Sequence, residues 1–152
     1  MRKEVIISDT SCLIVLSRIQ RLDLLKDLYG SILITEEVAC EFGEELPSWV
    51  EIKKVQNTAN LRVLKNIVDL GEASAIALAL ELDDTLLIVD DLKGRKEAQR
   101  LGLKITGLMG VLLKCKQENI ISEVKPILIA IKEASFRISE KIEMFVLQQA
   151  GE

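Results

Sequence analysis

The sequence predicts an α/β fold with three layers, in which helices cover both faces of a central, mostly parallel sheet of four to five strands. Two observations predict it. Short runs rich in Val, Ile and Leu alternate along the chain with longer segments of helical periodicity. The last part of the chain, from about residue 108, carries helical patterns only, so we expect a helical C-terminal extension.

Length and composition favour one domain. The chain has 152 residues, of which 49% are hydrophobic. A chain of this size buries roughly 70% of its unfolded surface, which is enough for a full core without disulfides. We expect a single domain over 1–152, with its core over about 4–118 and the C-terminal helices over about 120–150.

The first half of the chain alternates strand and helix patterns, bounded by residues that cap or end such elements. Thr35 is a typical helix N-cap, whereas Gly30 and Pro47 are typical of helix ends. The apolar period over 11–29 fits one helix or two short ones broken near Gln20-Arg21. The expected elements are a strand over 5–8, this helical segment, a strand over 31–34, a helix over 36–45 and an edge strand over 49–55.

The second half continues the same alternation and then becomes helical. Residues 71–80 are apolar almost all round, which indicates a helix buried on most faces. Residues 92–101 form a basic helix that Gly102 ends. The other expected elements are a helix over 60–70, strands over 85–89 and 103–106, and helices over 108–119, 122–134 and 139–149.

Composition excludes several kinds of chemistry. The chain has no His, which removes Ser-His-Asp and Cys-His catalysis and imidazole zinc sites. Cys12, Cys40 and Cys115 lack metal-type spacing and are expected to be reduced core or subunit-interface residues. We expect a cytoplasmic protein without membrane contact, since no signal-peptide pattern and no apolar run of ~20 residues is present. The net charge of −4 means that nucleic-acid binding would need a local basic patch.

Carboxylates recur where the carboxyl edge of the predicted sheet should lie. Asp9 follows the first strand, and Asp90-Asp91 follow the strand over 85–89. Open α/β sheets bind ligands in the crevice outside the carboxyl ends of their strands. If the two strands are neighbours, these carboxylates converge. Glu41 borders the core-facing side of its helix, and Glu72 opens the buried helix, so both can point into the same crevice.

Such a cluster predicts a metal site. Two unit charges about 4 Å apart repel by ~4 kcal/mol at an effective dielectric near 20, so the cluster must bind a cation or hold protons. An all-oxygen ligand set selects Mg²⁺ or Mn²⁺ over zinc or copper. A hard divalent ion polarises a phosphoryl oxygen and activates water, which indicates phosphodiester hydrolysis.

Each of these segments also has a purely structural interpretation. Residues 9–11 are types that cap a helix, and Asp90-Asp91 are compatible with a surface turn. Glu41 is one of several glutamates that solvent alone would explain, and Glu72 could serve only as a first-turn partner of the helix dipole.

Four motifs together resemble a PIN domain, from Val5 to about Lys116. The motifs are Ile7-Ser8-Asp9-Thr10-Ser11, Val38-Ala39-Cys40-Glu41-Phe42, Gly71-Glu72-Ala73-Ser74-Ala75 and Ile88-Val89-Asp90-Asp91, with Arg95, Ala98 and Leu101-Gly102-Leu103 behind them. The tail, with residues 134–139, looks like a prokaryotic PIN subgroup related to VapC-type toxins. Glu72 stands where many members of the family carry aspartate, and Leu108 stands where a threonine or similar small residue is expected.

The resemblance implies an endoribonuclease that depends on Mg²⁺ or Mn²⁺. It implies the toxin of a type II toxin–antitoxin pair, homodimeric and blocked by a small antitoxin protein near the acidic cleft. Ser11 takes the hydroxyl position beside the first acid, and Asp90 competes with Asp91 as the last metal ligand. The family's acidic positions fall on Asp9, Glu41, Glu72 and Asp91.

The sequence also suggests RNA-binding residues and two alternative functions. Lys93, Arg95, Lys96 and Arg100 are the candidates for RNA phosphate contacts, although such a run is usually an ordinary solvated helix face. One alternative function is a catalytically inert PIN-like module that binds RNA or protein. The other is a receiver-like phosphoacceptor domain, which the sequence of residues 88–91 suggests.

Overall fold

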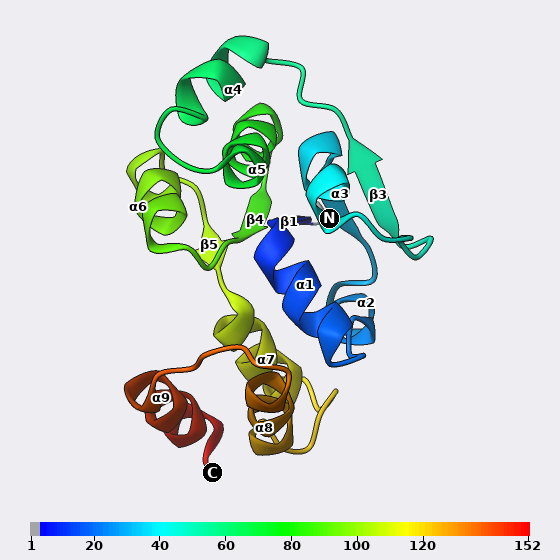
Figure 1. The fold of residues 1–152 in the computed structure, drawn as a ribbon, viewed down its shortest axis with the longest axis vertical. Coiled ribbons are helices and arrows are strands. Elements are labelled where there is room, and N and C mark those ends of the chain that lie inside the picture. The colour runs from blue at the N-terminus through cyan, green and yellow to red at the C-terminus, as the bar shows by residue number, and fades with distance from the viewer. Residues whose placement is uncertain (1–3) are drawn as a thin grey trace.

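The computed structural model describes residues 4–152. Five parallel strands form one sheet in the order β3-β2-β1-β4-β5. The three-layer fold with an all-parallel sheet confirms the predicted class (Figure 1). The strands are β1 (Val5–Ser8), β2 (Ile32–Thr35), β3 (Val50–Lys53), β4 (Thr85–Ile88) and β5 (Ile105–Thr106).

Helices follow each strand in the predicted order. Of the two alternatives for residues 11–29, the structure has two helices, and Gln20 takes a positive φ of 59° between them. The helices are α1 (Thr10–Arg18), α2 (Asp23–Tyr29), α3 (Glu36–Phe42), α4 (Thr58–Leu64), α5 (Leu70–Glu81), α6 (Leu92–Arg100), α7 (Leu108–Gln117), α8 (Lys125–Glu133) and α9 (Glu140–Ala150).

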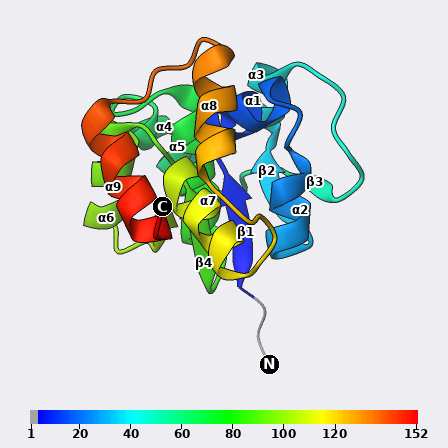
Figure 2. The same cartoon turned by 90° about the horizontal axis from the view of Figure 1, so that it is seen from below.

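Two apolar clusters lie on the two faces of the sheet. Successive residues of a strand point to opposite faces, so Ile6 joins one cluster and Ile7 the other. The first cluster packs under α1, α2, α3 and the C-terminal helices, and the second under α4, α5 and α6. The views in Figures 1 and 2 place α7, α8 and α9 together, away from α4. In the part of the chain that the structure describes, no helix is long and apolar enough to cross a membrane.

Several predicted bounds were wrong. The helix expected over 60–70 is α4, which ends at Leu64, and residues 65–69 form a separate connection to α5. The predicted helix was too long because Val68, which is not helical, packs into the core. Its position in the sequence therefore extends the helical spacing of apolar residues beyond the end of α4. The helix expected to reach 45 ends at Phe42, since Gly43 takes a left-handed φ of 68° and closes it.

The cysteines lie in different environments. Cys12 and Cys115 are buried, as expected of core residues. Cys40 is exposed on α3. It is therefore not a core residue of this chain, and the subunit-interface alternative stays a prediction.

Candidate functional site

The site lies where the chain reverses its direction of progress across the sheet. From β1 the chain moves to β2 and β3 on one side, whereas β4 and β5 lie on the other. The neighbouring strands β1 and β4 pair in parallel, with Ser8 opposite Ile88. The condition that the sequence left open is therefore met: the first strand and the strand over 85–89 are neighbours. A position where the strand order reverses in this way is a topological switch point, and it leaves a crevice outside the carboxyl ends of the two strands. Asp9 and Asp90 both lie at this crevice.

Asp9 is a buried carboxylate, only 1% exposed. It is the N-cap of α1, and its Oδ1 accepts a hydrogen bond from the Cys12 amide at 3.2 Å. Its Oδ2 accepts one from the Asp90 amide at 3.3 Å, which ties the ends of β1 and β4 together. Burial, and next the nearby Asp90 carboxylate, raise the pKa of Asp9 to about 7.

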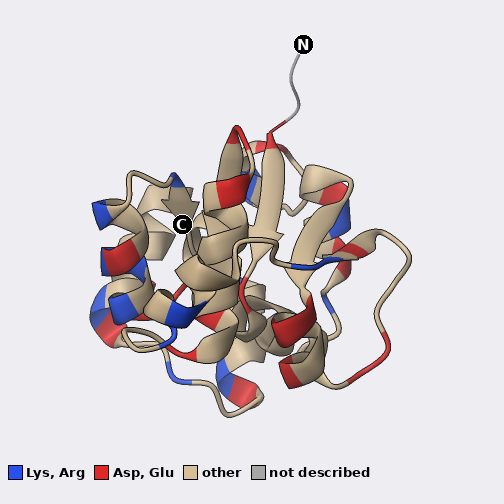
Figure 3. Ribbon diagram, turned by 90° about the horizontal axis from the view of Figure 1, so that it is seen from above, with Lys and Arg blue, Asp and Glu red and all other residues tan. Residues whose placement is uncertain are grey.

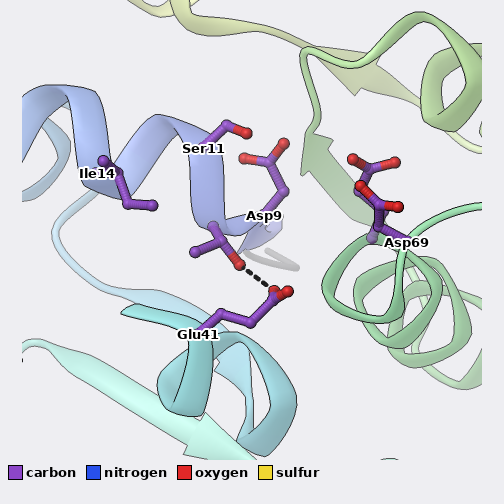
Figure 4. A pocket seen from close by; sticks show the side chains of 7 residues that line it. Asp9, Ser11, Ile14, Glu41 and Asp69 are labelled. Carbon is purple, nitrogen blue, oxygen red and sulfur yellow. Dashed lines mark hydrogen bonds between the residues drawn. The ribbon is translucent and has the colours of Figure 1, made fainter. Parts of the chain in front are cut away.

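Glu41 reaches the same crevice from α3. Its Oε1 accepts a hydrogen bond of 2.7 Å from the Thr10 hydroxyl, at the start of α1 (Figure 4). The first turn of α5 lies directly beside this carboxylate, because a Cβ built on Gly71 would come within 1.8 Å of Glu41 Oε1. The absence of a side chain at position 71 is what lets Glu41 extend into the crevice.

Glu72 lies in the first turn of α5 and carries an unsatisfied oxygen. Its Oε2 is buried and has no hydrogen-bond partner. A Cβ on Gly94 of α6 would lie 2.9 Å from this oxygen, so α5 and α6 approach closely around it. Burial, followed by the carboxylates of Asp91 and Asp69, raises the pKa of Glu72 to about 7.

The two aspartates after β4 have different partners. Asp91 is the N-cap of α6, and its Oδ2 accepts from the amides of Lys93 and Gly94. Asp90 Oδ1 accepts from the Leu108 amide at 2.9 Å, at the start of α7. Partial burial raises the pKa of Asp90, and the Leu108 amide opposes this shift. The structure thus gives Asp91 a capping role as well as a place beside Glu72.

The cleft between these side chains has a volume of about 400 Å³. In Figure 4, Asp9, Glu41 and Asp69 point toward the same space, and Ser11 lies on the side of Asp9. Three of the four predicted acidic ligands therefore line one cleft, whereas Asp91 lines the groove beside it. The lining residues are Asp9, Thr10, Ser11, Ile14, Glu41, Asp69 and Glu72.

Sequence reasoning missed Asp69 and Thr10. Asp69 was assigned to the end of a helix, but it stands at the N-cap position of α5 without a capping hydrogen bond, so its carboxylate is free to face the cleft. The signal that could have found it is an aspartate three residues before Glu72, next to Leu70 and Gly71. Thr10 was visible as a hydroxyl residue beside Asp9.

A buried hydroxyl pair fixes α3 against α5. Ser74 donates its hydroxyl to the Gly71 carbonyl at 2.7 Å, so the 2.6 Å contact between Thr35 and Ser74 is donated by Thr35. Thr35 also caps α3 by accepting from the Val38 amide. The helices that carry Glu41 and Glu72 are therefore joined by hydrogen bonds beneath the cleft.

The predicted basic residues of α6 do not form one continuous surface. Arg95 turns inward and donates from Nη1 to the Val89 carbonyl at 2.9 Å, and Arg100 pairs with Glu97 of the same helix. Lys93 and Lys96 are exposed and have no ion pair among residues 4–152. Figure 3 shows Lys and Arg gathered toward the side of the molecule that carries α6.

The chemistry of the cleft fits a hard cation. All its polar side chains offer oxygen, and within residues 4–152 no Lys or Arg forms an ion pair with Asp9, Asp69 or Glu72. The orphaned Glu72 Oε2 is a donor atom that a cation would satisfy. Within the described chain no three of these side chains already form a complete metal-binding group, so binding would require their side chains to draw together.

Comparison with known proteins shows the family. Searches of curated proteins and of solved structures returned no match. The family model DUF3368, described as a PIN domain, matches residues 5–152, from β1 through α9. PIN domains are generally nucleases that use divalent metal ions. The chain, with its carboxylates gathered at the switch point of a parallel sheet, belongs to the PIN domain family.

Proposed function

We propose that this protein is an endoribonuclease that hydrolyses RNA phosphodiester bonds with Mg²⁺ or Mn²⁺. One observation carries the proposal. Asp9 and Glu72 are desolvated carboxylates without a cationic partner in the described chain, and they line the cleft together with Glu41. Leaving such groups unpaired is costly for folding, which supports a role in binding a cation.

The proposed roles follow from position. Asp9, Glu41, Glu72 and Asp91 would hold the metal, with Asp90 as a further ligand beside them. When bound, a divalent ion supplies Lewis-acid polarisation of a phosphoryl oxygen and activation of water. Ser11 is exposed at the first turn of α1 and, with Asp90, would orient the attacking water. The hydrogen bond from Thr10 to Glu41 would keep that carboxylate extended across the cleft.

Cleavage of labelled single-stranded RNA by the purified protein, with Mn²⁺ or Mg²⁺ and with EDTA, tests the activity. We expect cleavage only with metal. Asp9→Asn should reduce the rate by at least ~10–100-fold, because it removes the charge of a proposed ligand, and even an outer-shell partner of a metal site is worth that much. Asp27→Asn, on the exposed side of α2, is the matched control and should keep full activity. Cleavage by Asp9→Asn at the wild-type rate would refute the site.

The toxin role is a finer proposal that rests on the resemblance of residues 134–139 to the VapC-related subgroup. It includes a homodimer, a cytoplasmic location and a small antitoxin that covers the cleft. Induced expression in a bacterial host should arrest growth, and Asp9→Asn should not. If a small protein is encoded beside this gene, its co-expression should restore growth. Normal growth of cells that accumulate active wild-type protein would contradict the toxin role.

A catalytically inert PIN-like module that binds RNA or protein is the second candidate. It is favoured by the open arrangement of the cleft, in which no three described side chains form a complete metal-binding group. Calorimetric titration with Mn²⁺ separates the two candidates, since an inert module should bind metal only weakly and equally in the wild type and in Asp9→Asn. The receiver-like alternative gains no support from the family match.

A further inference from the structure

A second groove lies beside the carboxylate cleft. It has a volume of about 520 Å³ and runs between residues 65–69, which connect α4 to α5, and residues 91–93, where α6 begins. Figure 1 shows this connection passing beside α6. The groove and the cleft share Asp69, and Asp91 stands in the wall of the groove. A ligand that crosses the cleft can therefore continue into the groove.

The lining of the groove contains two lysines, two aspartates and exposed apolar side chains. Lys65 lines one wall and Lys93 the other, both are exposed, and neither has an ion pair within the described chain. In the same lining, Leu92 is 66% exposed and Ile67 is 44% exposed. Lysines and exposed apolar side chains in one lining suit a ligand that carries repeated negative charges and flat apolar groups. Of the two aspartates in this lining, Asp69 also lines the cleft and Asp91 is a proposed metal ligand.

We propose that this groove binds the segment of single-stranded RNA that flanks the scissile phosphate, with Lys65 and Lys93 contacting backbone phosphates and Leu92 and Ile67 contacting unstacked bases. The proposal rests on the proposed ribonuclease function and identifies where its substrate lies. The two lysines support it, because a chain of net charge −4 that binds RNA needs local positive charge, and neither Lys65 nor Lys93 forms an ion pair within the described chain. Single strands suit the groove since their bases are free to lie against apolar side chains.

This assignment changes the expected RNA-binding residues. Arg95 and Arg100 were expected to contact phosphates, but Val89 and Glu97 already engage their guanidinium groups. Lys93 keeps its expected role, and Lys65 joins it from a different element. The RNA path then crosses from α6 to the α4–α5 connection instead of running along α6.

The first test compares RNA binding by variants that remove two positive charges. Affinity for a fluorescent single-stranded oligoribonucleotide is measured by anisotropy in EDTA, where metal-dependent hydrolysis is absent, over a series of salt concentrations. Lys65→Gln with Lys93→Gln should weaken binding by about tenfold or more at low salt and reduce the slope of log K against log salt by ~1.4, or ~0.7 for each lost phosphate contact. Lys26→Gln with Lys141→Gln, two exposed lysines outside the groove, should leave both unchanged.

The second test examines the apolar wall. Leu92→Ala should weaken binding severalfold without changing the salt slope, because it removes a base contact and no charge. Val63→Ala is the matched control, since Val63 is 62% exposed on α4 and lies outside the groove lining. Thermal unfolding of each variant checks that the fold is retained, as expected for such exposed side chains.

The outcomes separate this inference from the nuclease proposal. Weaker binding by the groove variants together with no cleavage by the wild type would support RNA binding in the groove, but it would refute the nuclease and with it the scissile phosphate beside the groove. Metal-dependent cleavage with unchanged RNA affinity in the groove variants would refute the groove alone. A wild-type protein that binds no single-stranded RNA, or one that binds through α6 so that only Arg95 or Arg100 variants lose affinity, would also overturn the groove.

Discussion

Two regions of the molecule contain a carboxylate with little solvent exposure, but only one of them surrounds it with hydrogen-bond donors and a cation. Near α8, the Glu152 side chain is only 12% exposed, and it accepts from the amides of Val124 and Lys125 and pairs with Lys116 at 3.0 Å. These partners lower the pKa of Glu152. In the cleft, burial raises the pKa of Asp9 and Glu72 to about 7, and Glu72 Oε2 has no partner.

The difference separates structural from functional use of the same chemical group. At Glu152 two amides and an ammonium replace the water that the carboxylate loses, so the group stabilises the packing of the C-terminal helices. In the cleft the described chain supplies no such cation, so the carboxylates destabilise the metal-free protein. Four experiments test this contrast.

The largest expected effect is that Asp9→Asn loses activity but stabilises the metal-free protein at pH 8. A shift from 3.8 to about 7 corresponds to ~4 kcal/mol of cost for the ionised form. The hydrogen bond from the Asp90 amide is lost in the variant, which removes ~1 kcal/mol of this gain. The free energy of unfolding in EDTA should therefore rise by ~2–3 kcal/mol, measured by chemical denaturation. A destabilised variant would mean that Asp9 is a structural group like Glu152.

The next effect is the dependence of stability on pH and metal. Because the pKa of Asp9 is raised on folding, its favourable contribution is complete below its unfolded pKa near 3.8 and is lost as the pH rises to about 7. In EDTA, the melting temperature of the wild type relative to Asp9→Asn should therefore fall between pH 5 and pH 8. Saturating Mn²⁺ at pH 8 should raise the wild-type melting temperature and leave the variant nearly unchanged. Equal pH profiles in EDTA would contradict the uncompensated charge.

A smaller effect is expected from Gly71→Ala, which tests how closely α5 approaches Glu41. The new Cβ would collide with Glu41 Oε1 and would move that carboxylate out of the cleft. We expect about tenfold lower metal-dependent activity with little change in stability, since alanine suits the first turn of a helix. Gly110→Ala is the control, because a Cβ there would also collide with a side-chain oxygen, 2.3 Å from the Thr106 hydroxyl, but Gly110 lies outside the cleft lining. Equal activity of the two variants would mean that metal-dependent activity does not depend on the position of the Glu41 carboxylate in the cleft.

The smallest effect is expected from Glu152→Gln, which should change stability in the opposite direction to Asp9→Asn. It removes the charge from the ion pair and weakens the contacts to two amides, so the free energy of unfolding should fall by ~1 kcal/mol at pH 7. Because the pKa of Glu152 is lowered on folding, the difference from the wild type should disappear as acid protonates the carboxylate. Activity should not change. A more stable variant would remove the contrast between the two regions.

Much of the fold could be predicted because its signals are local. The apolar runs and the caps at Asp9 and Thr35 depend on neighbouring residues, and the structure confirms them. The predicted bounds of α4 were wrong because Val68 lies in an irregular connection but packs into the core. In the sequence it therefore looks like one more apolar residue of the helix. The role of Asp69 was missed for the same reason.

The sequence by itself determined which carboxylates end strands or open helices, that any metal ligands must be oxygen, and that the helices lie on both faces of the sheet. Only the tertiary structure decided that β1 and β4 are neighbours, that Asp69 and Thr10 join the cleft, that Arg95 turns inward to Val89 and that Lys65 and Lys93 line one groove. The reason is that caps and periods arise from contacts within one turn or strand, whereas the neighbours of a charged side chain come from segments far apart in the chain.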